Sequence, residues 1–151
     1  MLTEKSKLKP GRDYIGVGGG ILIFNDKKEV LLARRKGTKN EDGLWSKPGG
    51  GIDYGEKVEV ALKREIKEEV GIAVDIWGYS LHTDHIIKKD KQHWVAFNYL
   101  AKIKSGVPKN REPEKCDRVE WFSLEKLPRK LNQTTRETIK NYLAGKYIKL
   151  K

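Results

Sequence analysis

Residues 50–72 read GGIDYGEKVEVALKREIKEEVGI, and this stretch is the most informative part of the sequence for the fold. Between Glu56 and Val70, apolar residues recur at spacings of three and four, which predicts an amphipathic helix. Gly71 follows at the position where a left-handed cap residue is expected. The stretch therefore predicts a glycine-rich turn that leads into a capped helix.

Three acids near the end of this helix face the apolar stripe instead of the solvent. At about 100° per residue, Glu65, Glu68 and Glu69 fall on or beside the stripe, and the lysines fall opposite it. Carboxylates at positions i, i+3 and i+4 share one face and repel one another, which is costly unless a cation lies among them. Grouped oxygen ligands suit Mg²⁺, for which Mn²⁺ can substitute. A solvated Lys/Glu helix is the competing interpretation, and the helix alone does not decide between the two.

The glycines before the helix add a second, weaker indication. Gly49, Gly50 and Gly51 allow close backbone approach, so their N–H and C=O groups can meet a phosphate or a metal ion. A loop that enters a helix N-terminus in this way also suits anions. Most glycine-rich turns are only turns, and the glycines at 16–20 do not match the dinucleotide-binding spacing because Ile21 interrupts it.

The remaining segments predict an α/β fold. Tyr14–Phe24 and Val30–Ala33 flank a turn at 25–28 and predict a hairpin. Extended segments are expected at 72–87, 94–103 and 119–122, a polar loop at 106–118, and an amphipathic helix at 134–143. The order of strands, helix, strands and helix favours a mixed sheet packed between helices. We expect one domain over residues 1–151, with a polar lead-in at 1–12 and a C-terminal helix and basic tail at 129–151.

Length and composition indicate the number of domains, the kinds of partner and the cellular location of the protein. A length of 151 residues suits one domain, and the net charge of +11 permits an anionic partner, although its dispersed lysines favour a solvated surface over a nucleic-acid footprint. Cys116 is the only cysteine, so no internal disulfide can form, which fits a reducing cytosol. No apolar run is long enough for a signal peptide or a membrane span. These features predict a cytoplasmic protein without a membrane partner.

Several residues that often carry chemistry are assigned no role. His82, His85 and His93 lack the further ligands of a zinc site, so they are interpreted as ordinary strand or loop histidines. Core packing explains aromatic residues such as Trp45 and Trp94 better than base stacking does. Cys116 has no evident base beside it and is not expected to be a nucleophile.

At the helix and its preceding turn the sequence resembles the Nudix box, the signature of the Nudix hydrolase superfamily. The pattern is Gly, five residues, Glu, seven residues, then Arg-Glu-aliphatic-x-Glu-Glu-x-Gly-aliphatic. It is met without departure by Gly50, Glu56, Arg64, Glu65, Ile66, Glu68, Glu69, Gly71 and Ile72. The likeness extends over about residues 14–128 and is greatest to MutT-like enzymes of the nucleotide pool, on segments such as WSKPGG (45–50) and EPEKC (112–116).

The resemblance implies a Nudix fold, with a mixed β-sheet in an α/β/α sandwich, and roles for the residues of the box. Glu65, Glu68 and Glu69 would surround one or more Mg²⁺ ions, and Glu65 is the position that can act as general base. Arg64 and Glu56 would form the internal ion pair of the box. The Gly49 carbonyl would be an added ligand of the metal ion. Glu114, or failing it Glu112, would supply a further acid from the loop. The alternative for these two residues is an acid that is simply solvated on the loop.

The implied reaction is hydrolysis of a nucleoside triphosphate to a monophosphate and pyrophosphate, with homodimers common among related enzymes. ADP-ribose or another nucleoside diphosphate derivative is an alternative, although the proline that often follows the box in such members is missing between Gly71 and Val107. Removal of pyrophosphate from an RNA 5′ end is a second alternative, which the net charge permits. A non-catalytic nucleotide-binding module is a third, against which the complete box argues.

Overall fold

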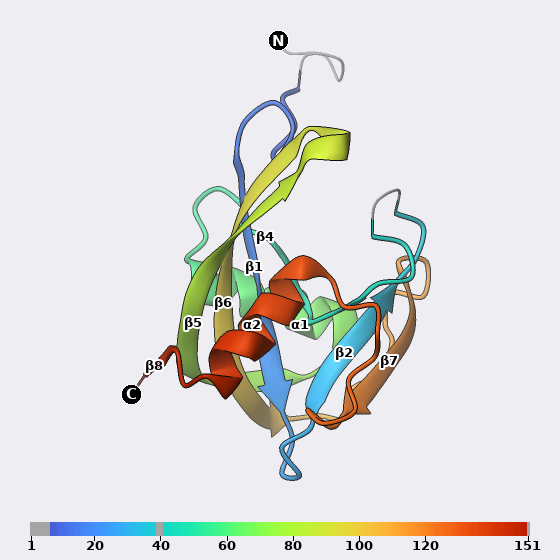
Figure 1. Ribbon diagram of the computed structural model, residues 1–151, viewed down its shortest axis with the longest axis vertical. Coiled ribbons are helices and arrows are strands. Elements are labelled where there is room, and N and C mark those ends of the chain that lie inside the picture. The colour runs from blue at the N-terminus through green and yellow to red at the C-terminus, as the bar shows by residue number, and fades with distance from the viewer. Residues whose placement is uncertain (1–6, 39–40, 151) are drawn as a thin grey trace.

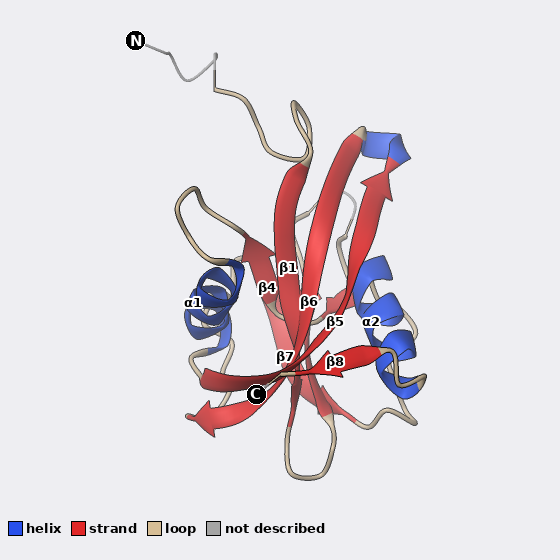
Figure 2. Ribbon diagram, turned by 90° about the vertical axis from the view of Figure 1, so that its left-hand side faces the viewer, coloured by secondary structure: helices blue, strands red, loops and turns tan. Residues whose placement is uncertain are grey.

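A computed structural model describes residues 7–38 and 41–150 of the chain. One mixed sheet lies between two helices, with α1 against one face and α2 against the other (Figures 1 and 2). The predicted Nudix α/β/α sandwich is confirmed. The helices are α1 (Val58–Val70) and α2 (Gln133–Leu143), with a short 3₁₀ helix η2 (Lys88–Asp90). The strands are β1 (Gly16–Phe24), β2 (Val30–Arg35), β3 (Trp45–Ser46), β4 (Gly49–Gly51), β5 (Ala73–Ile87), β6 (Gln92–Ser105), β7 (Cys116–Phe122) and β8 (Tyr147–Lys149).

Strand β1 is the centre of the sheet, and its partners change along its length. It runs parallel to β6 from Gly16 to Phe24 and antiparallel to the other strands that it contacts. The predicted hairpin with β2 is confirmed at its turn, but the register pairs only Phe24 with Val30. Beyond that point β1 pairs with β4, and β2 pairs with β7. The sheet order is β3-β2-β1-β6-β5-β8.

From Gly20 to Phe24 both faces of β1 are buried, which explains the apolar run in this half of the strand. Ile21 and Ile23 pack with Leu62 and Ile66 of α1, whereas Leu22 belongs to the second core beneath α2. Because successive strand side chains point to opposite faces, one strand supplies both cores. The second core also contains Phe24, Val30, Leu32, Trp45, Leu100 and Ile139.

The two ends of the chain are more structured than their polar sequence indicates. The predicted lead-in at 1–12 lies outside the described residues up to position 6, but Gly11 packs against Trp94 and Arg12 pairs with Asp90. In the predicted basic tail, Tyr147–Lys149 form β8, which pairs with β5 and closes that edge of the sheet. No helix among the described residues is long and apolar enough to cross a membrane.

Candidate functional site

The helix that bears the acids packs tightly on the sheet and ends where expected. Ala61, Leu62, Ile66 and Val70 are buried, and Gly71 caps the helix with a left-handed φ of 75°. Strand β4 lies directly against the acid face of α1. A Cβ atom built at Gly50 would lie 2.6 Å from Cδ of Glu65, so only glycine leaves room for this carboxylate beside the strand.

Arg64 holds one side of the acid face in place. Its guanidinium donates two hydrogen bonds of 2.8 Å to the Glu56 carboxylate, as the resemblance implied for this pair. A third nitrogen, Nη1, lies 3.1 Å from Glu65 Oε1 and 3.3 Å from Glu68 Oε1. The hydrogen bonds from Arg64 hold the pKa of Glu56 below its usual range. Arg64 therefore ties the turn before the helix to the acids on it.

Glu69 lies deepest among the acids of the helix. Burial, with repulsion from Glu65 and Glu112, raises the pKa of Glu69 to about 8, although a backbone hydrogen bond from Gly49 opposes this shift. Burial likewise raises the pKa of Glu65, against the opposing effect of Arg64. These carboxyl groups are enclosed and repel one another, so the site favours a cation among them.

Glu112 joins this group through the loop between β6 and β7. The N–H groups of Lys109 and Arg111 donate to the carbonyls of Val70 and Glu69, which fixes the loop on the end of α1. Repulsion from Glu112 consequently reaches both Glu65 and Glu69. The sequence favoured Glu114 for this place and kept Glu112 as the substitute. In the structure Glu114 is exposed and Glu112 is half-buried, and it is the charge of Glu112 that reaches Glu65 and Glu69.

We call Glu65, Glu69 and Glu112 the acid cluster. Among residues 7–38 and 41–150, no three His, Cys, Asp or Glu side chains are already gathered at metal-ligand spacing. The cluster nevertheless fits a divalent cation, because its donors are hard carboxylate oxygens whose mutual repulsion a cation would relieve. Glu68 is more exposed, with 52% of its side chain accessible, and lies on the solvent edge beside Arg64.

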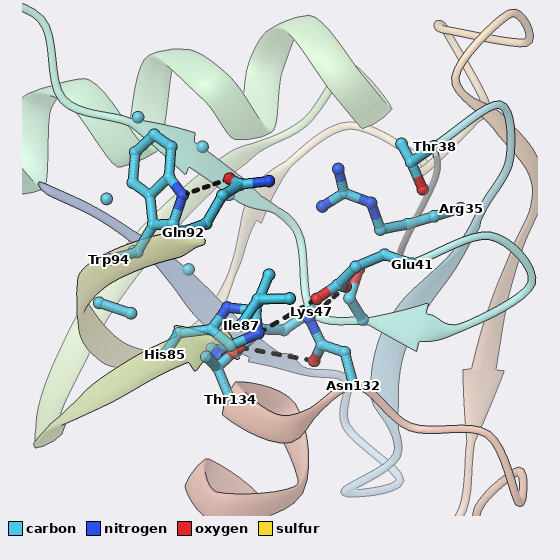
Figure 3. Close-up of a pocket in the computed structure, with 18 of the residues that line it drawn as sticks. Arg35, Thr38, Glu41, Lys47, His85, Ile87, Gln92, Trp94, Asn132 and Thr134 are labelled. Carbon is cyan, nitrogen blue, oxygen red and sulfur yellow. Dashed lines mark hydrogen bonds and ion pairs between the residues drawn. The ribbon is translucent and has the colours of Figure 1, made fainter. Parts of the chain in front are cut away.

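The protein has a pocket of about 470 Å³, which we call the main pocket, and Figure 3 shows residues that line it. Gly49 and Gly50 line it, and both also contact the acids of α1. Arg35 lines it as well and is close enough to Glu69 to lower the pKa of that carboxyl. The pocket and the acids therefore share a boundary formed by β4 and Arg35. Its other walls come from β1, β5, β6, the loop before β3 and the start of α2.

A polar network occupies the inner end of the main pocket (Figure 3). The Glu41 carboxylate lies 3.3 Å from His85 Nε2 and accepts a 3.2 Å hydrogen bond from the Asn132 amide. Asn132 is also the N-cap of α2, where its Oδ1 accepts from the Thr135 N–H. Burial lowers the pKa of His85, with the cations Lys47 and Arg35 acting in the same direction and Glu41 opposing.

Lys47 is buried in this network. Its ammonium donates a 3.1 Å hydrogen bond to the Thr134 hydroxyl, and its backbone N–H donates to the Thr135 hydroxyl. Burial lowers the pKa of Lys47 to about 7, against the opposing effects of Glu41 and Glu137. The pocket thus holds a desolvated amine close to the first turn of α2.

The sequence indicated the acids but missed this pocket. His85 was interpreted as an ordinary strand histidine and Trp94 as core, and both line the main pocket. Trp45 does pack in the core, where it meets Phe122 edge-on. One signal was present in the sequence: Lys47 stands between apolar or small residues and the Pro-Gly turn, a place where a charged side chain is unusual.

Comparison with known proteins identifies the class. The sequence model of the NUDIX domain matches residues 15–142. An RNA pyrophosphohydrolase of Bartonella bacilliformis is 30% identical over 136 residues, which span 74% of this chain and 79% of that protein. The crystal structure of a MutT NUDIX hydrolase from Burkholderia pseudomallei is 41% identical, with a TM-score of 0.78 over 83% of this chain and 95% of that one. A NUDIX hydrolase from Nitrosomonas europaea shares the fold at 21% identity, with a TM-score of 0.78.

The chain belongs to the Nudix family, and within it to the MutT-like enzymes. It is a pyrophosphohydrolase, an enzyme that hydrolyses a phosphoanhydride bond. Nudix hydrolases generally use divalent metal ions, which agrees with the hard oxygen donors of the acid cluster.

Proposed function

We propose that the protein hydrolyses nucleoside triphosphates to monophosphate and pyrophosphate, with Mg²⁺ as the cofactor and Mn²⁺ able to substitute. The observation that supports this most is the position of the main pocket, which adjoins the acid cluster across Gly49 and Gly50. A nucleotide whose base lies in the pocket can extend its phosphates past Arg35 towards the acids. The cation Arg12 also lines the pocket, although it is paired with Asp90.

In this proposal the acids hold the ion, and one of them also accepts a proton from the attacking water. Glu65, Glu69 and Glu112 would hold the cation, with Glu68 and the Gly49 carbonyl as further ligands. When bound, the ion would lower the pKa of a water and neutralise phosphate charge. Glu65 accepts the proton of the attacking water, and Arg64 keeps this carboxylate oriented through the contact described above. The remaining contribution of the protein is positioning and electrostatics.

A panel of substrates tests the proposal. Canonical and oxidised nucleoside triphosphates, ADP-ribose, a dinucleoside tetraphosphate and a 5′-triphosphate RNA would be incubated with Mg²⁺ or Mn²⁺, and the products separated by chromatography. We expect metal-dependent release of pyrophosphate from a triphosphate, and loss of this activity in Glu68→Gln. Turnover of ADP-ribose alone, or of no compound, would exclude the proposed substrate class.

A second candidate is removal of pyrophosphate from the 5′ end of RNA. Curated relatives that this chain resembles carry the name RNA pyrophosphohydrolase. The structure offers room for the following nucleotides in a second hollow of about 380 Å³, which shares Arg35 with the main pocket. We call it the basic hollow. Its cations are Arg34, Arg35, Lys36, Arg129 and Lys130, with Asp42 and Asp117 as its acids.

A further inference from the structure

Lys47 is the buried cation of the main pocket and has hydrogen-bonding capacity to spare. Only 6% of the residue is exposed, and its amine can donate up to three hydrogen bonds. In the part of the chain that the structure describes, the Thr134 hydroxyl is the only acceptor hydrogen-bonded to it. A buried donor without an acceptor is costly, so the site is balanced when a ligand supplies one.

Two neighbouring polar groups, Glu41 and Asn132, already have protein donors. Of the Glu41 carboxylate oxygens, one faces His85 and the other accepts from Asn132. The Asn132 carbonyl oxygen is engaged by the Thr135 N–H at the start of α2. These two groups are therefore already engaged by protein donors, whereas the amine of Lys47 still has donors to spare.

The path of the Lys47 side chain is fixed by the strand behind it. A Cβ atom built at Gly20 would lie 3.0 Å from both Cγ and Cε of Lys47. The stem therefore passes over a position of β1 that has no side chain, and the amine is delivered to the same inner end as Thr134. This close fit makes Lys47 a positioned group instead of a mobile surface lysine.

The orientation of a nucleotide in the pocket follows from its two ends. Arg35, Gly49 and Gly50 form the end beside the acid cluster, where phosphates are hydrolysed under the proposed function. Lys47 and Thr134 form the end beneath the start of α2 (Figure 3). With the phosphates placed beside the acid cluster, as the proposed function has them, the acceptor left for Lys47 is one on the base.

We propose that Lys47 selects the nucleobase by donating a hydrogen bond to a carbonyl oxygen on its edge, so that an oxo base is preferred to its amino counterpart. An exocyclic amino group would place a donor against the donors of Lys47, whereas an oxo group supplies the missing acceptor. The inference rests on the proposed function, in that a nucleoside triphosphate occupies the main pocket.

Two pairs of substrates test this contact. Inosine and adenosine triphosphates carry an oxo or an amino group at position 6 of the purine, and uridine and cytidine triphosphates at position 4 of the pyrimidine. In each pair the adjacent ring nitrogen changes as well, from a donor N–H in the oxo base to an acceptor in the amino base. For at least one pair we expect kcat/KM to favour the oxo member by about tenfold or more, since a site built to bind a polar group discriminates strongly against a mismatch. Equal kcat/KM values within both pairs would overturn the inference.

Variants connect the preference to the residue. Lys47→Met keeps the length of the stem and removes the donors, so we expect the oxo-to-amino ratio to fall towards one. Its melting temperature should be unchanged or higher, because a desolvated amine is removed. Lys104→Met, at an exposed position near the far end of β6, is the matched control and should keep the wild-type ratio. A Lys47→Met protein that retains the ratio would contradict the proposal.

Binding measurements distinguish a failure of the proposed function from a failure of the base-selection proposal. Calorimetry with inosine and adenosine monophosphates needs no turnover, and we expect the inosine compound to bind more tightly to wild type but not to Lys47→Met. If this holds while no triphosphate is hydrolysed, the proposed function fails and the selection by Lys47 stands. If instead Lys47→Met weakens inorganic tripolyphosphate as much as it weakens inosine triphosphate, Lys47 binds phosphate and the base-selection proposal is wrong.

Discussion

Glu69 is an enclosed carboxyl group, and in the absence of a cation its burial costs stability. Its carboxyl is enclosed by the loop that carries Glu112 and by strand β4, and its pKa is raised to about 8. The folded protein therefore binds a proton at Glu69 near neutral pH that the unfolded chain would release. Such a group is destabilising unless a cation occupies the site.

We expect Glu69→Gln to lower kcat by about 10²-fold or more, because an ion ligand contributes several kcal/mol of charge stabilisation. The metal-free variant should nevertheless unfold at a higher temperature than metal-free wild type. Since the folded pKa is raised, wild type gains stability as pH falls from about 8 towards its ordinary 4.5, and the variant lacks this gain. Thermal unfolding across pH, with and without Mg²⁺, measures both effects. A variant that is less stable than wild type throughout would contradict this account.

Gly50 offers a test of a single contact. A methyl group in Gly50→Ala would meet the Glu65 carboxylate, which can swing away because it ends a flexible side chain. We expect a fold that is intact by circular dichroism and a kcat reduced by about tenfold or more.

The neighbouring Gly51→Ala is the matched control. A Cβ atom built there has its nearest neighbour at 4.0 Å, and Gly51 is not among the glycines of positive φ. It should keep activity near that of wild type. Equal losses in the two variants would show that the turn, and not the approach of Glu65, is what Gly50 provides.

Among the secondary-structure elements, α1 was the one best predicted from the sequence. Its apolar spacing is local, so periodicity alone gave the buried face, and Gly71 marked its end as expected. The β5–β6 pair was anticipated as two extended segments, but the bulges in its register were not. Strand β8 was missed because Tyr147–Lys149 has no pattern of its own and becomes a strand only by pairing with β5.

The stability of α1 can be examined at its centre. Ile66 is fully buried between the acid face and the sheet, in the core with Ile21 and Leu62. We expect Ile66→Ala to reduce the free energy of unfolding by about 2–5 kcal/mol, through lost burial and the cavity left behind. Urea unfolding measures the loss. A change below about 1 kcal/mol would mean that the helix is held by Arg64 and the cap more than by its apolar face.

For the molecule as a whole, the sequence showed a net charge of +11 but not its arrangement. The acids of one helix could be placed because they are neighbours on a single element. The main pocket could not be predicted from the sequence. Its residues Lys47, His85 and Asn132 come from three segments that only the tertiary fold brings together. The basic hollow arises in the same way, from β2 and the segment before α2. A homodimer, expected from related enzymes, stays a prediction for light scattering to check.

The basic hollow separates the two candidate substrates. We expect the double variant Arg129→Glu, Lys130→Glu to leave kcat/KM for a nucleoside triphosphate nearly unchanged. If RNA is a substrate, its kcat/KM should fall about tenfold or more, with a shallower dependence on salt because fewer phosphates are neutralised. The check is a salt titration of both substrates with both proteins. An unchanged salt slope for RNA would exclude the basic hollow as the place of the following nucleotides.

The position of β1 between the two helices has a consequence for how such an enzyme can diverge. The groups proposed to carry the hydrolysis come from α1 and the loop beside it, whereas the groups at the inner end of the main pocket come from the start of α2, β5 and the residues around β3. Under the proposed function, substitutions near α2 would alter which base is accepted and leave the acids of α1 in place. A duplicated copy of this chain could acquire a new substrate through a few changes near α2, and laboratory evolution aimed at a new nucleotide would do best to begin there.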